Sequence, residues 1–419
     1  MHHFQYKADE LYCEEVPVRL IAEKTGTPCY IYSHATLSHH FKTFDSAFTK
    51  VAHLICYAVK ANSNIAILKL FGSMGGGVDI VSGGELYRAR RAAIPPDRVV
   101  YSGVGKTVEE IDFALCEKIL MFNIESTQEL DQINRRAEAM GTKASISLRI
   151  NPDIDPNTHP YISTGMKKNK FGISADSALR TCEKAKTLKS IEIVGLGCHI
   201  GSQLTDVAPF VDALRRVRSL IDRLRQTGLH IRYLDLGGGL GIVYDQEAPP
   251  QPHEYAKALL GELENIDCTL IFEPGRVIVG NAGILVTKVL YTKRNQAKNF
   301  VITDGAMNDL IRPSLYGSYH YIQPILRGVG ETEIVDVVGP ICESGDFLAR
   351  DRGLPMPAAG DYLAVMSAGA YGFSMSSNYN SRPRAPEVLV KGGQYFVIRQ
   401  RETWEDLVQP ETIPDFLAD

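Results

Sequence analysis

The chain has 419 residues, of which 44% are hydrophobic, 22% charged and 8% aromatic, and its formal net charge is −4. These values argue against a disordered or fibrous chain, and the length predicts two domains rather than one. The nearly balanced charge predicts no nucleic-acid partner and no binding to an anionic membrane surface. The single dense basic run, Lys167, Lys168 and Lys170, is expected to be a solvated loop.

The cysteines and the N-terminus indicate the cellular compartment. Eight cysteines are spread singly, without a C-x-x-C pair, and this spacing fits neither a zinc site nor a disulfide framework. No apolar run approaches the roughly 20 residues of a membrane span, and the first residues lack the basic and then apolar profile of a signal peptide. We therefore expect a cytoplasmic protein with reduced thiols, no bound metal and no membrane contact.

Short apolar segments rich in β-forming residues recur between residues 50 and 275. Eight of them are predicted strands: Leu54–Val59, Gly77–Val81, Arg98–Tyr101, Ile119–Ile124, Ser145–Ile150, Ile193–His199, Ile231–Leu236 and Thr269–Phe272. Between most of them lie segments with helical apolar spacing, among them Glu109–Cys116, Thr127–Met140, Ala175–Thr187, Ala208–Thr227 and Glu254–Glu264. Strands that alternate with amphipathic helices predict a parallel sheet. Eight such units in about 225 residues match a TIM (β/α)8 barrel, and a doubly wound sheet is the structural alternative.

Polar and reactive residues stand where these strands end. They are Lys60, Asp79, Asn123, Arg149, His199, the run Gly237-Gly238-Gly239, and the run Glu273-Pro274-Gly275-Arg276. All of them belong to the C-terminal face of a barrel, where TIM-barrel active sites are built. A doubly wound sheet offers no reason for this pattern. Each residue alone has an ordinary explanation as a solvated side chain, but their joint placement predicts an active site on a barrel.

Beyond residue 280 the pattern changes to alternating apolar residues with little helix. The predicted strands there are Gly283–Tyr291, Phe300–Thr303, Glu333–Val338, Tyr362–Met366 and Tyr395–Arg399. They indicate an antiparallel β domain, which a strand over Thr27–Tyr32 is expected to join. The predicted fold class is therefore α/β. A (β/α)8 barrel is expected over residues 36–278, and a β domain of Greek-key type over 1–35 plus 279–419.

Two features of the barrel suggest a phosphate-bearing aldehyde as cofactor. Lys60, in Tyr57–Asn62, places an amine after an apolar strand, where partial burial favours a nucleophile that forms a Schiff base; a lysine that extends into solvent is the alternative. The glycine run Leu236–Gly241 exposes backbone N–H groups to an anion, and TIM barrels often bind phosphate with the loops after strands seven and eight. Glycines that only form turns are the alternative for this run.

Three other side chains would complete a site for pyridoxal phosphate (PLP). Glu273 at a strand end could keep the pyridine nitrogen protonated, unless it serves as an ion-pair partner of Arg276. His199 could stack on the ring and Ser202 could contact the phosphate, unless His199 is an ordinary rim histidine.

The second domain carries charged and reactive residues of its own. Cys342 follows an apolar strand and Gly339-Pro340, so we expect it at a turn as a proton donor, with a structural cysteine as the alternative. Arg276, Arg312 and Glu343 together would match a zwitterionic group, since a guanidinium binds a carboxylate and a carboxylate binds an ammonium.

The sequence resembles the fold-type III PLP-dependent decarboxylases, and most closely those that act on diaminopimelate. The matching segments run in family order over nearly the whole chain: Tyr57–Asn62, Val78–Leu86, Cys198–Gln203, Leu236–Gly241, Glu273–Arg276, Cys342–Asp346 and Asn378–Arg384.

The resemblance implies roles for these residues. Lys60 carries PLP, His199 stacks on the ring, and Glu273 faces the pyridine nitrogen. The other cofactor contacts are Asp79, Ser202, Gly238, Gly239, Pro274, Gly275, Arg276 and Tyr371. The substrate contacts are Arg276, Arg312, Tyr316, Glu343 and Tyr371. Cys342 is the proton donor and enters the site with Glu343 from a partner subunit, so a homodimer with shared active sites is implied.

The implied reaction is the decarboxylation of meso-2,6-diaminopimelate to L-lysine and carbon dioxide, the last step of lysine biosynthesis. Three alternatives remain open. A sister decarboxylase would act on ornithine, arginine or carboxynorspermidine, whose amine or guanidinium end Arg312 would repel. A racemase would need a PLP ring whose pyridine nitrogen is less protonated than Glu273 favours. A non-enzymatic PLP carrier would not need a second domain that presents Cys342, Arg312 and Glu343.

Overall fold

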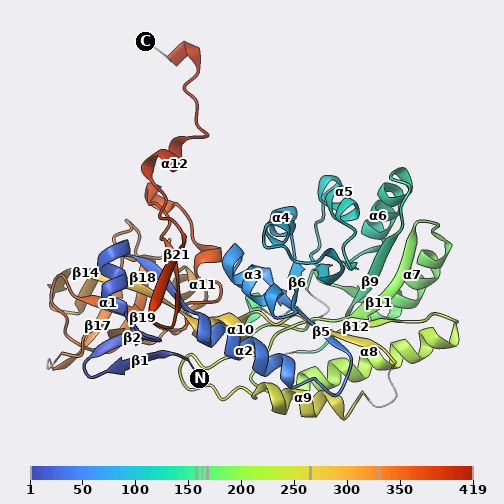
Figure 1. Ribbon diagram of the computed structural model, residues 1–419, viewed down its shortest axis with the longest axis horizontal. Helices are drawn as coiled ribbons and strands as arrows, with labels where there is room; N and C mark the ends of the chain where they lie inside the picture. The colour runs from blue at the N-terminus through green and yellow to red at the C-terminus, as the bar shows by residue number, and fades with distance from the viewer. Residues whose placement is uncertain are drawn as a thin grey trace. The chain divides into compact units, whose positions relative to one another are not determined.

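The computed structural model describes residues 2–155, 159–162, 164–166, 169–263, 267–328 and 331–417. The chain divides into two compact units (Figure 1), one of residues 38–279 and one that combines residues 1–37 with 280–419. Lys167 and Lys168 of the expected basic loop lie outside the described residues, as does Glu264 at the end of an expected helix.

The unit of residues 38–279 is a closed parallel barrel, which confirms the predicted fold and excludes the doubly wound sheet. Each strand pairs in parallel with the next along the chain, and the pairing of β13 with β5 closes the ring. The barrel strands are β5 (His53–Ala58), β6 (Gly77–Ile80), β7 (Val99–Tyr101), β8 (Met121–Ile124), β9 (Ala144–Asn151), β11 (Ile191–Gly197), β12 (Tyr233–Asp235) and β13 (Thr269–Phe272). The short β10 (Ile173–Ser174) pairs with β9 outside the ring.

Helices surround the barrel strands (Figure 1): α2 (His34–Ser46) precedes the first strand, and the others follow strands along the chain. These others are α3 (Ile65–Ser73), α4 (Gly83–Arg91), α5 (Val108–Glu117), α6 (Thr127–Ala139), α7 (Ala175–Thr187), α8 (Ala208–Gln226), α9 (Pro252–Leu260) and α10 (Arg276–Val279). Several begin at a polar side chain that accepts a backbone N–H: Asn64, Ser82, Thr107, Ser126 and Ser174. Such caps satisfy donors that the first helical turn leaves unpaired.

Apolar packing between helices and strands holds the barrel unit together. The rings of Phe48 and Phe272 lie 4.0 Å apart between centroids, and Tyr255 of α9 packs edge-on against Phe48 at 6.0 Å. Helix α8 buries Phe210, Leu214, Val217, Ile221 and Leu224. This spacing of three and four residues keeps one face of the helix against the strands. None of the helices in the described part of the chain combines the length and the hydropathy that a membrane span requires.

The second unit is a β-rich domain, as predicted. Its main sheet has the order β18-β17-β15-β14-β4-β20-β21, and most neighbours in it are antiparallel. Two pairs, β15–β17 and β4–β20, are parallel, which the sequence did not indicate. The strands are β4 (Cys29–Ser33), β14 (Gly283–Arg294), β15 (Asn299–Thr303), β17 (Thr332–Val338), β18 (Phe347–Pro355), β20 (Glu387–Lys391) and β21 (Gln394–Arg399).

Smaller elements complete this unit. Strand β19 (Tyr362–Val365) pairs with both β14 and β16 (Ile322–Pro324). Near the N-terminus, β1 (Phe4–Lys7), β2 (Glu10–Cys13) and β3 (Val16–Pro17) form a three-stranded sheet. The helices are α1 (Val18–Thr25), α11 (Arg312–Tyr316) and α12 (Trp404–Val408). The expected strand near residue 30 is β4, which pairs with β14 and β20 and so joins the N-terminal segment to this unit.

Gly77 offers a test of the barrel packing. A Cβ atom at this position would lie 2.1 Å from the carbonyl oxygen of Arg98, directly before β7. We expect Gly77→Ala to lower the free energy of unfolding by roughly 1–3 kcal/mol, because the two strands must move apart. Chemical denaturation measures this loss. Gly105→Ala is the matched control, since its Cβ would meet nothing within 4 Å; equal midpoints for the two variants would contradict the tight packing of β6 on β7.

Candidate active site

The carboxyl ends of the barrel strands bring together a set of polar side chains from distant parts of the sequence. Lys60 lies in a short 3-10 helix, η1 (Val59–Ala61), directly after β5. Asp79, Asn123 and Arg149 lie near the carboxyl ends of β6, β8 and β9. His199 and Glu273 follow β11 and β13. Because all the barrel strands run in the same direction, these residues share one end of the barrel.

Lys60 is held by a buried carboxylate. Its Nζ donates a hydrogen bond to Oδ2 of Asp79 at 2.8 Å, and the Asp79 side chain is fully buried while that of Lys60 is 34% exposed. The amine is therefore fixed in direction but remains accessible at the rim. Glu85 of α4 lies close by, and burial raises its pKa to about 7, although a hydrogen bond from the backbone of Val81 and the charge of Lys60 oppose this shift.

A glycine loop after β12 approaches the neighbouring strand ends very closely. A Cβ atom on Gly238 would lie 2.2 Å from the carbonyl oxygen of Glu273, and one on Gly239 would lie 2.5 Å from that of Gly201. The φ of Gly239 is +121°, a conformation that strongly favours glycine. The loop therefore presents bare backbone at the rim, as an anion cradle requires.

His199 is a neutral, oriented ring. The backbone N–H of Gly238 donates to its Nδ1 at 3.1 Å, so the ring hydrogen of the neutral form lies on Nε2. Burial, followed by the positive charges of Arg149 and Lys60, holds the pKa of His199 well below its usual range. An uncharged imidazole in a fixed plane is suited to lie against an aromatic ring.

Arg276 provides a cation beside the glycine loop. It is buried at the start of α10 and donates to Oγ of Ser202 at 2.9 Å and to the hydroxyl of Tyr244 at 2.7 Å. Sequence reasoning did not single out Tyr244. Its position in the long segment after the glycine run gives no periodic signal that would have identified it.

Two carboxyl groups lie buried side by side at the ends of β12 and β13. Asn123 Nδ2 donates to Oδ2 of Asp235 at 2.8 Å and lies 3.3 Å from Oε1 of Glu273. Burial raises the pKa of both acids, and the charge of Asp235 raises that of Glu273 further. Sequence reasoning missed Asp235, although an acid between Leu234 and Leu236, at the end of the predicted strand Ile231–Leu236, was a detectable signal.

A second buried ion pair lies next to these acids. Arg149 Nη1 donates to Oε1 of Glu125 at 2.7 Å, and both side chains are largely buried. Nη2 of Arg149 is also buried and has no hydrogen-bond partner among the described residues. It lines a cavity of about 10 Å³ together with Ser102, Asn123, Gly197, Cys198, His199, Asp235 and Glu273. The polar groups of the barrel end therefore surround a small internal space beneath the rim.

The remaining predicted site residues lie in the second unit. Arg312 is buried, with its Nε 3.4 Å from Nε2 of His320 and its Nη2 3.2 Å from Oγ of Ser318. Its guanidinium carbon lies 5.8 Å from the ring centre of Tyr316, so these two residues are together. Cys342 and Glu343 are exposed on a loop after β17. Tyr371 has a positive φ of 56°.

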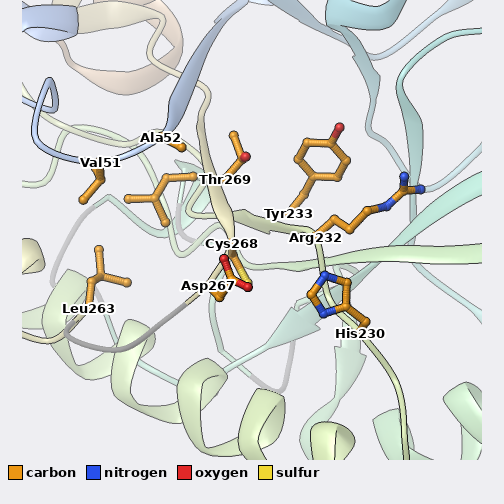
Figure 2. Close-up of a pocket in the computed structure, with 10 residues that line it drawn as sticks. Val51, Ala52, His230, Arg232, Tyr233, Leu263, Asp267, Cys268 and Thr269 are labelled. Carbon is orange, nitrogen blue, oxygen red and sulfur yellow. The ribbon is translucent and has the colours of Figure 1, made fainter.

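A larger pocket lies at the opposite end of the barrel. It has a volume of about 510 Å³, and Val51, Ala52, Tyr233, Cys268 and Thr269 line it with five other residues (Figure 2). Val51 and Ala52 precede β5, while Tyr233 and Thr269 begin β12 and β13. None of the predicted site residues lines this pocket. Because TIM-barrel chemistry occurs at the carboxyl ends of the strands, we assign the active site to the other end.

The residues at the carboxyl end fit a PLP molecule. PLP requires an amine for its aldehyde, an anion cradle for its phosphate and a partner for its pyridine nitrogen. Lys60 offers the amine, while bare glycine backbone with Ser202 and Arg276 offers the cradle. Glu273 offers a buried carboxyl group. The fold and these residues define a TIM-barrel enzyme of the PLP-dependent class.

Comparisons with known proteins agree with this class. Residues 34–280 match the family described as "pyridoxal-dependent decarboxylase, pyridoxal binding domain". A curated diaminopimelate decarboxylase of Vibrio cholerae is 53% identical over 415 residues, which cover 99% of both chains. The solved diaminopimelate decarboxylase of Helicobacter pylori, complexed with L-lysine, is 45% identical with a TM-score of 0.91, covering 94% of this chain and 98% of that one. The enzyme of M. jannaschii, also in complex with L-lysine, is 38% identical with a TM-score of 0.95 and full coverage of both chains. This chain therefore belongs to the pyridoxal-dependent decarboxylases.

Glu85 provides a pH-dependent test of the site. Its pKa rises from the ordinary 4.5 to about 7 in the folded protein, so the unfolded chain loses this proton at lower pH than the folded chain does. Between these two values the folded state binds more protons, and its stability therefore falls as the pH rises. We expect Glu85→Gln to gain stability relative to the parent protein across this window, as measured by denaturation of the cofactor-free chain at several pH values.

Glu110 is the matched control, because its pKa is shifted in the opposite direction. Burial alone would raise the pKa of Glu110, but hydrogen bonds from the backbone of Gly83 and Thr107 outweigh burial and lower it. The stability that Glu110 contributes is present above the ordinary pKa of a glutamate and is lost as the pH falls through its lowered value. If the difference in unfolding free energy between Glu85→Gln and the parent protein does not vary from pH 4.5 to 7, the raised pKa of Glu85 is contradicted.

Proposed function

We propose that this protein is a PLP-dependent carboxy-lyase that converts meso-2,6-diaminopimelate into L-lysine and carbon dioxide, the last step of lysine biosynthesis. The full-length identity of 53% to a diaminopimelate decarboxylase carries the choice of substrate. The solved relatives that contain L-lysine, the product of this reaction, support the same choice.

The barrel residues would hold the cofactor as follows. Lys60 binds its aldehyde carbon, and Asp79 orients the amine through the 2.8 Å hydrogen bond. His199 lies against the ring, and Glu273 contacts the pyridine nitrogen. The phosphate contacts come from Ser202, Gly238, Gly239, Pro274, Gly275, Arg276 and Tyr371. When bound, PLP supplies an electron sink for the electron pair that remains after carbon dioxide leaves.

Residues of the second unit would bind the end of the substrate that lies away from the reacting carbon. Diaminopimelate carries a second amine and a second carboxylate, which Glu343 and Arg312 match in charge. His320 Nδ1 lies 2.9 Å from the carbonyl oxygen of Met366 and donates to it, so Nε2 can accept from Arg312. The guanidinium is thus held in a fixed direction before substrate arrives. Tyr316, Tyr371 and Arg276 complete the substrate contacts.

This arrangement also weighs against the other candidates. A buried arginine would repel the distal amine or guanidinium of ornithine, arginine or carboxynorspermidine, whereas it attracts a carboxylate. A buried carboxyl group at the position of Glu273 favours a protonated ring, which a racemase does not need. A PLP carrier needs no exposed thiol and no buried substrate arginine.

We further propose that the protein acts as a homodimer in the cytoplasm. Cys342 and Glu343 would complete the site of the partner subunit, with Sγ of Cys342 giving its proton to the substrate carbon that has lost carbon dioxide. The exposure of both residues supports a contact with a second chain. All eight cysteines are free, which supports a reducing compartment.

The reaction itself is the first test. We expect the protein with PLP to release lysine and carbon dioxide from meso-diaminopimelate, and to do so at least tenfold less well from ornithine, because a missing distal contact costs at least about 1.4 kcal/mol. Lys60→Ala should lose the visible absorption of lysine-bound PLP together with activity.

Two results would contradict this function. One is equal turnover of ornithine and diaminopimelate, and the other is a Lys60→Ala protein that keeps both activity and the lysine-bound spectrum. Lys106→Ala is not a suitable control, because Lys106 forms a buried ion pair with Glu129. Lys118→Ala, at the end of α5, replaces a lysine outside the site and should leave both readouts unchanged.

Mixed dimers test the shared site. Lys60→Ala and Cys342→Ala proteins should each be inactive, but exchange of their subunits should restore activity. A mixed dimer has one site that lacks both residues and one intact site, so random exchange leaves about one quarter of the sites intact. A mixture that contains mixed dimers by mass yet remains inactive would contradict the shared site. Cys116→Ala, which removes another exposed cysteine, is the matched control and should keep full activity.

A further inference from the structure

We propose that Asp235 is a positioning residue that keeps a proton on Glu273 and, through Glu273, directs that proton to the pyridine nitrogen of the cofactor. This inference rests on the proposed function, because it takes Glu273 as the partner of the ring nitrogen. It adds a second acid to the site, one that does not itself touch the cofactor.

The first observation is the shared environment of the two acids. Asp235 is 2% exposed and Glu273 is 6% exposed, on neighbouring strands β12 and β13. A single amide group, Nδ2 of Asn123, lies within 2.8 Å of an oxygen of one and 3.3 Å of an oxygen of the other. Two carboxyl groups this close and this buried cannot both be ionised, so the pair retains one proton.

The hydrogen-bond donors decide where the negative charge lies. Asp235 accepts from the backbone N–H of Gly237 at 2.9 Å and from Asn123 at 2.8 Å, so both of its oxygens have a donor. Among the described residues, Glu273 accepts from Ser102 and Asn123, each at the longer distance of 3.3 Å and both to Oε1. Burial raises the pKa of both acids, while a side-chain hydrogen bond between them lowers the pKa of Asp235 and raises that of Glu273. Donors stabilise a carboxylate. The charge therefore belongs to Asp235, and the proton belongs to Glu273.

The other ionisable groups around the pair do not neutralise it. Lys60 donates to Asp79, and Arg149 pairs with Glu125. The remaining groups that face the pair are Asp79 itself, neutral His199, and three side chains that burial keeps protonated: Cys56, Cys198 and Tyr255. No cation is left over, among the described residues, to replace the retained proton.

The proton balance follows from this charge assignment. Before the cofactor binds, Asp235 carries one negative charge and Glu273 is neutral. When a neutral pyridine nitrogen meets Glu273, the carboxyl O–H bond breaks, an N–H bond forms, and Glu273 becomes the carboxylate that pairs with the new cation. The total charge stays at one negative. The charge of Asp235 then disfavours loss of the ring proton, because that loss would leave two buried carboxylates beside a neutral ring, so the ring nitrogen holds its proton to higher pH.

The test uses Asp235→Asn in the full chain, with two readouts other than activity. In the cofactor-free protein, infrared difference spectra against Glu273→Gln isolate the carbonyl band of protonated Glu273. In the holoenzyme, the 15N resonance of labelled PLP reports whether its ring nitrogen is protonated. We expect Asp235→Asn to shift the loss of both signals to lower pH, because the like charge that disfavours ionisation of Glu273 is gone.

Ser102→Ala is the matched control with the opposite sign. Ser102 Oγ donates to Oε1 of Glu273 at 3.3 Å, and removing a donor to the ionised form should shift the infrared band to higher pH. The parent protein alone also tests the inference, without any change at position 235. A Glu273 that is already ionised at neutral pH in the cofactor-free parent overturns it.

Failure of the inference and failure of the proposed function give different results. If Asp235→Asn leaves the infrared titration of Glu273 unchanged, the role of Asp235 is overturned, whatever the enzyme's activity. If Glu273→Gln leaves the 15N resonance of the ring unchanged, Glu273 is not the ring partner, and the proposed placement of the cofactor falls together with the inference.

Discussion

The parallel pairing of eight strands into a closed ring is the constraint on which the site depends. Each strand ends at the same rim, so residues that are far apart in the sequence become neighbours there. Asn123 and Asp235, for example, are 112 positions apart yet lie 2.8 Å apart through Nδ2 and Oδ2. The closing pair β13–β5 matters most, because it brings the segment with Glu273 next to the segment with Lys60. An open sheet with the same strands would leave these two residues at opposite edges.

The cationic and acidic side chains at this rim are not evenly paired, and this explains the pKa shifts of its buried acids. Lys60 and Arg149 each have an acidic partner within 2.8 Å. Asp235 and Glu273 share the donor Asn123 but have no cationic partner within hydrogen-bond distance among the described residues, and burial shifts the pKa of both upward. A ring nitrogen that becomes cationic on binding would supply the missing positive charge. Binding of the cofactor would then be favoured by electrostatics as well as by the proposed bond to Lys60, because a buried unpaired charge is costly.

Several groups of the site are held in a fixed direction before any ligand binds. The glycine loop admits no Cβ at Gly238, so backbone can approach where a side chain would block. Its N–H group also sets the tautomer of His199. In the other unit, His320 and Ser318 orient the buried guanidinium of Arg312. Groups fixed before ligand binds lose little entropy on binding, which favours both affinity and a defined reacting geometry.

Local periodicity in the sequence determined most secondary-structure elements of the barrel. Helix Ala175–Thr187 and strand Thr269–Phe272 occur at the predicted residues, since their apolar spacing and polar ends are local signals. The family motifs likewise identified the strand ends that carry Lys60, His199 and Glu273.

Strand β18 was not predicted, because its charged residues from Arg350 to Arg352 hide the alternation of apolar and polar residues. Its pairing with β17 defines it instead. The parallel pairs β15–β17 and β4–β20 depend on contacts between segments distant in the chain, which no local pattern encodes. The place of Asp235 at the end of a predicted strand was visible in the sequence, but its contact with Asn123 and its burial beside Glu273 exist only once the ring of strands has closed.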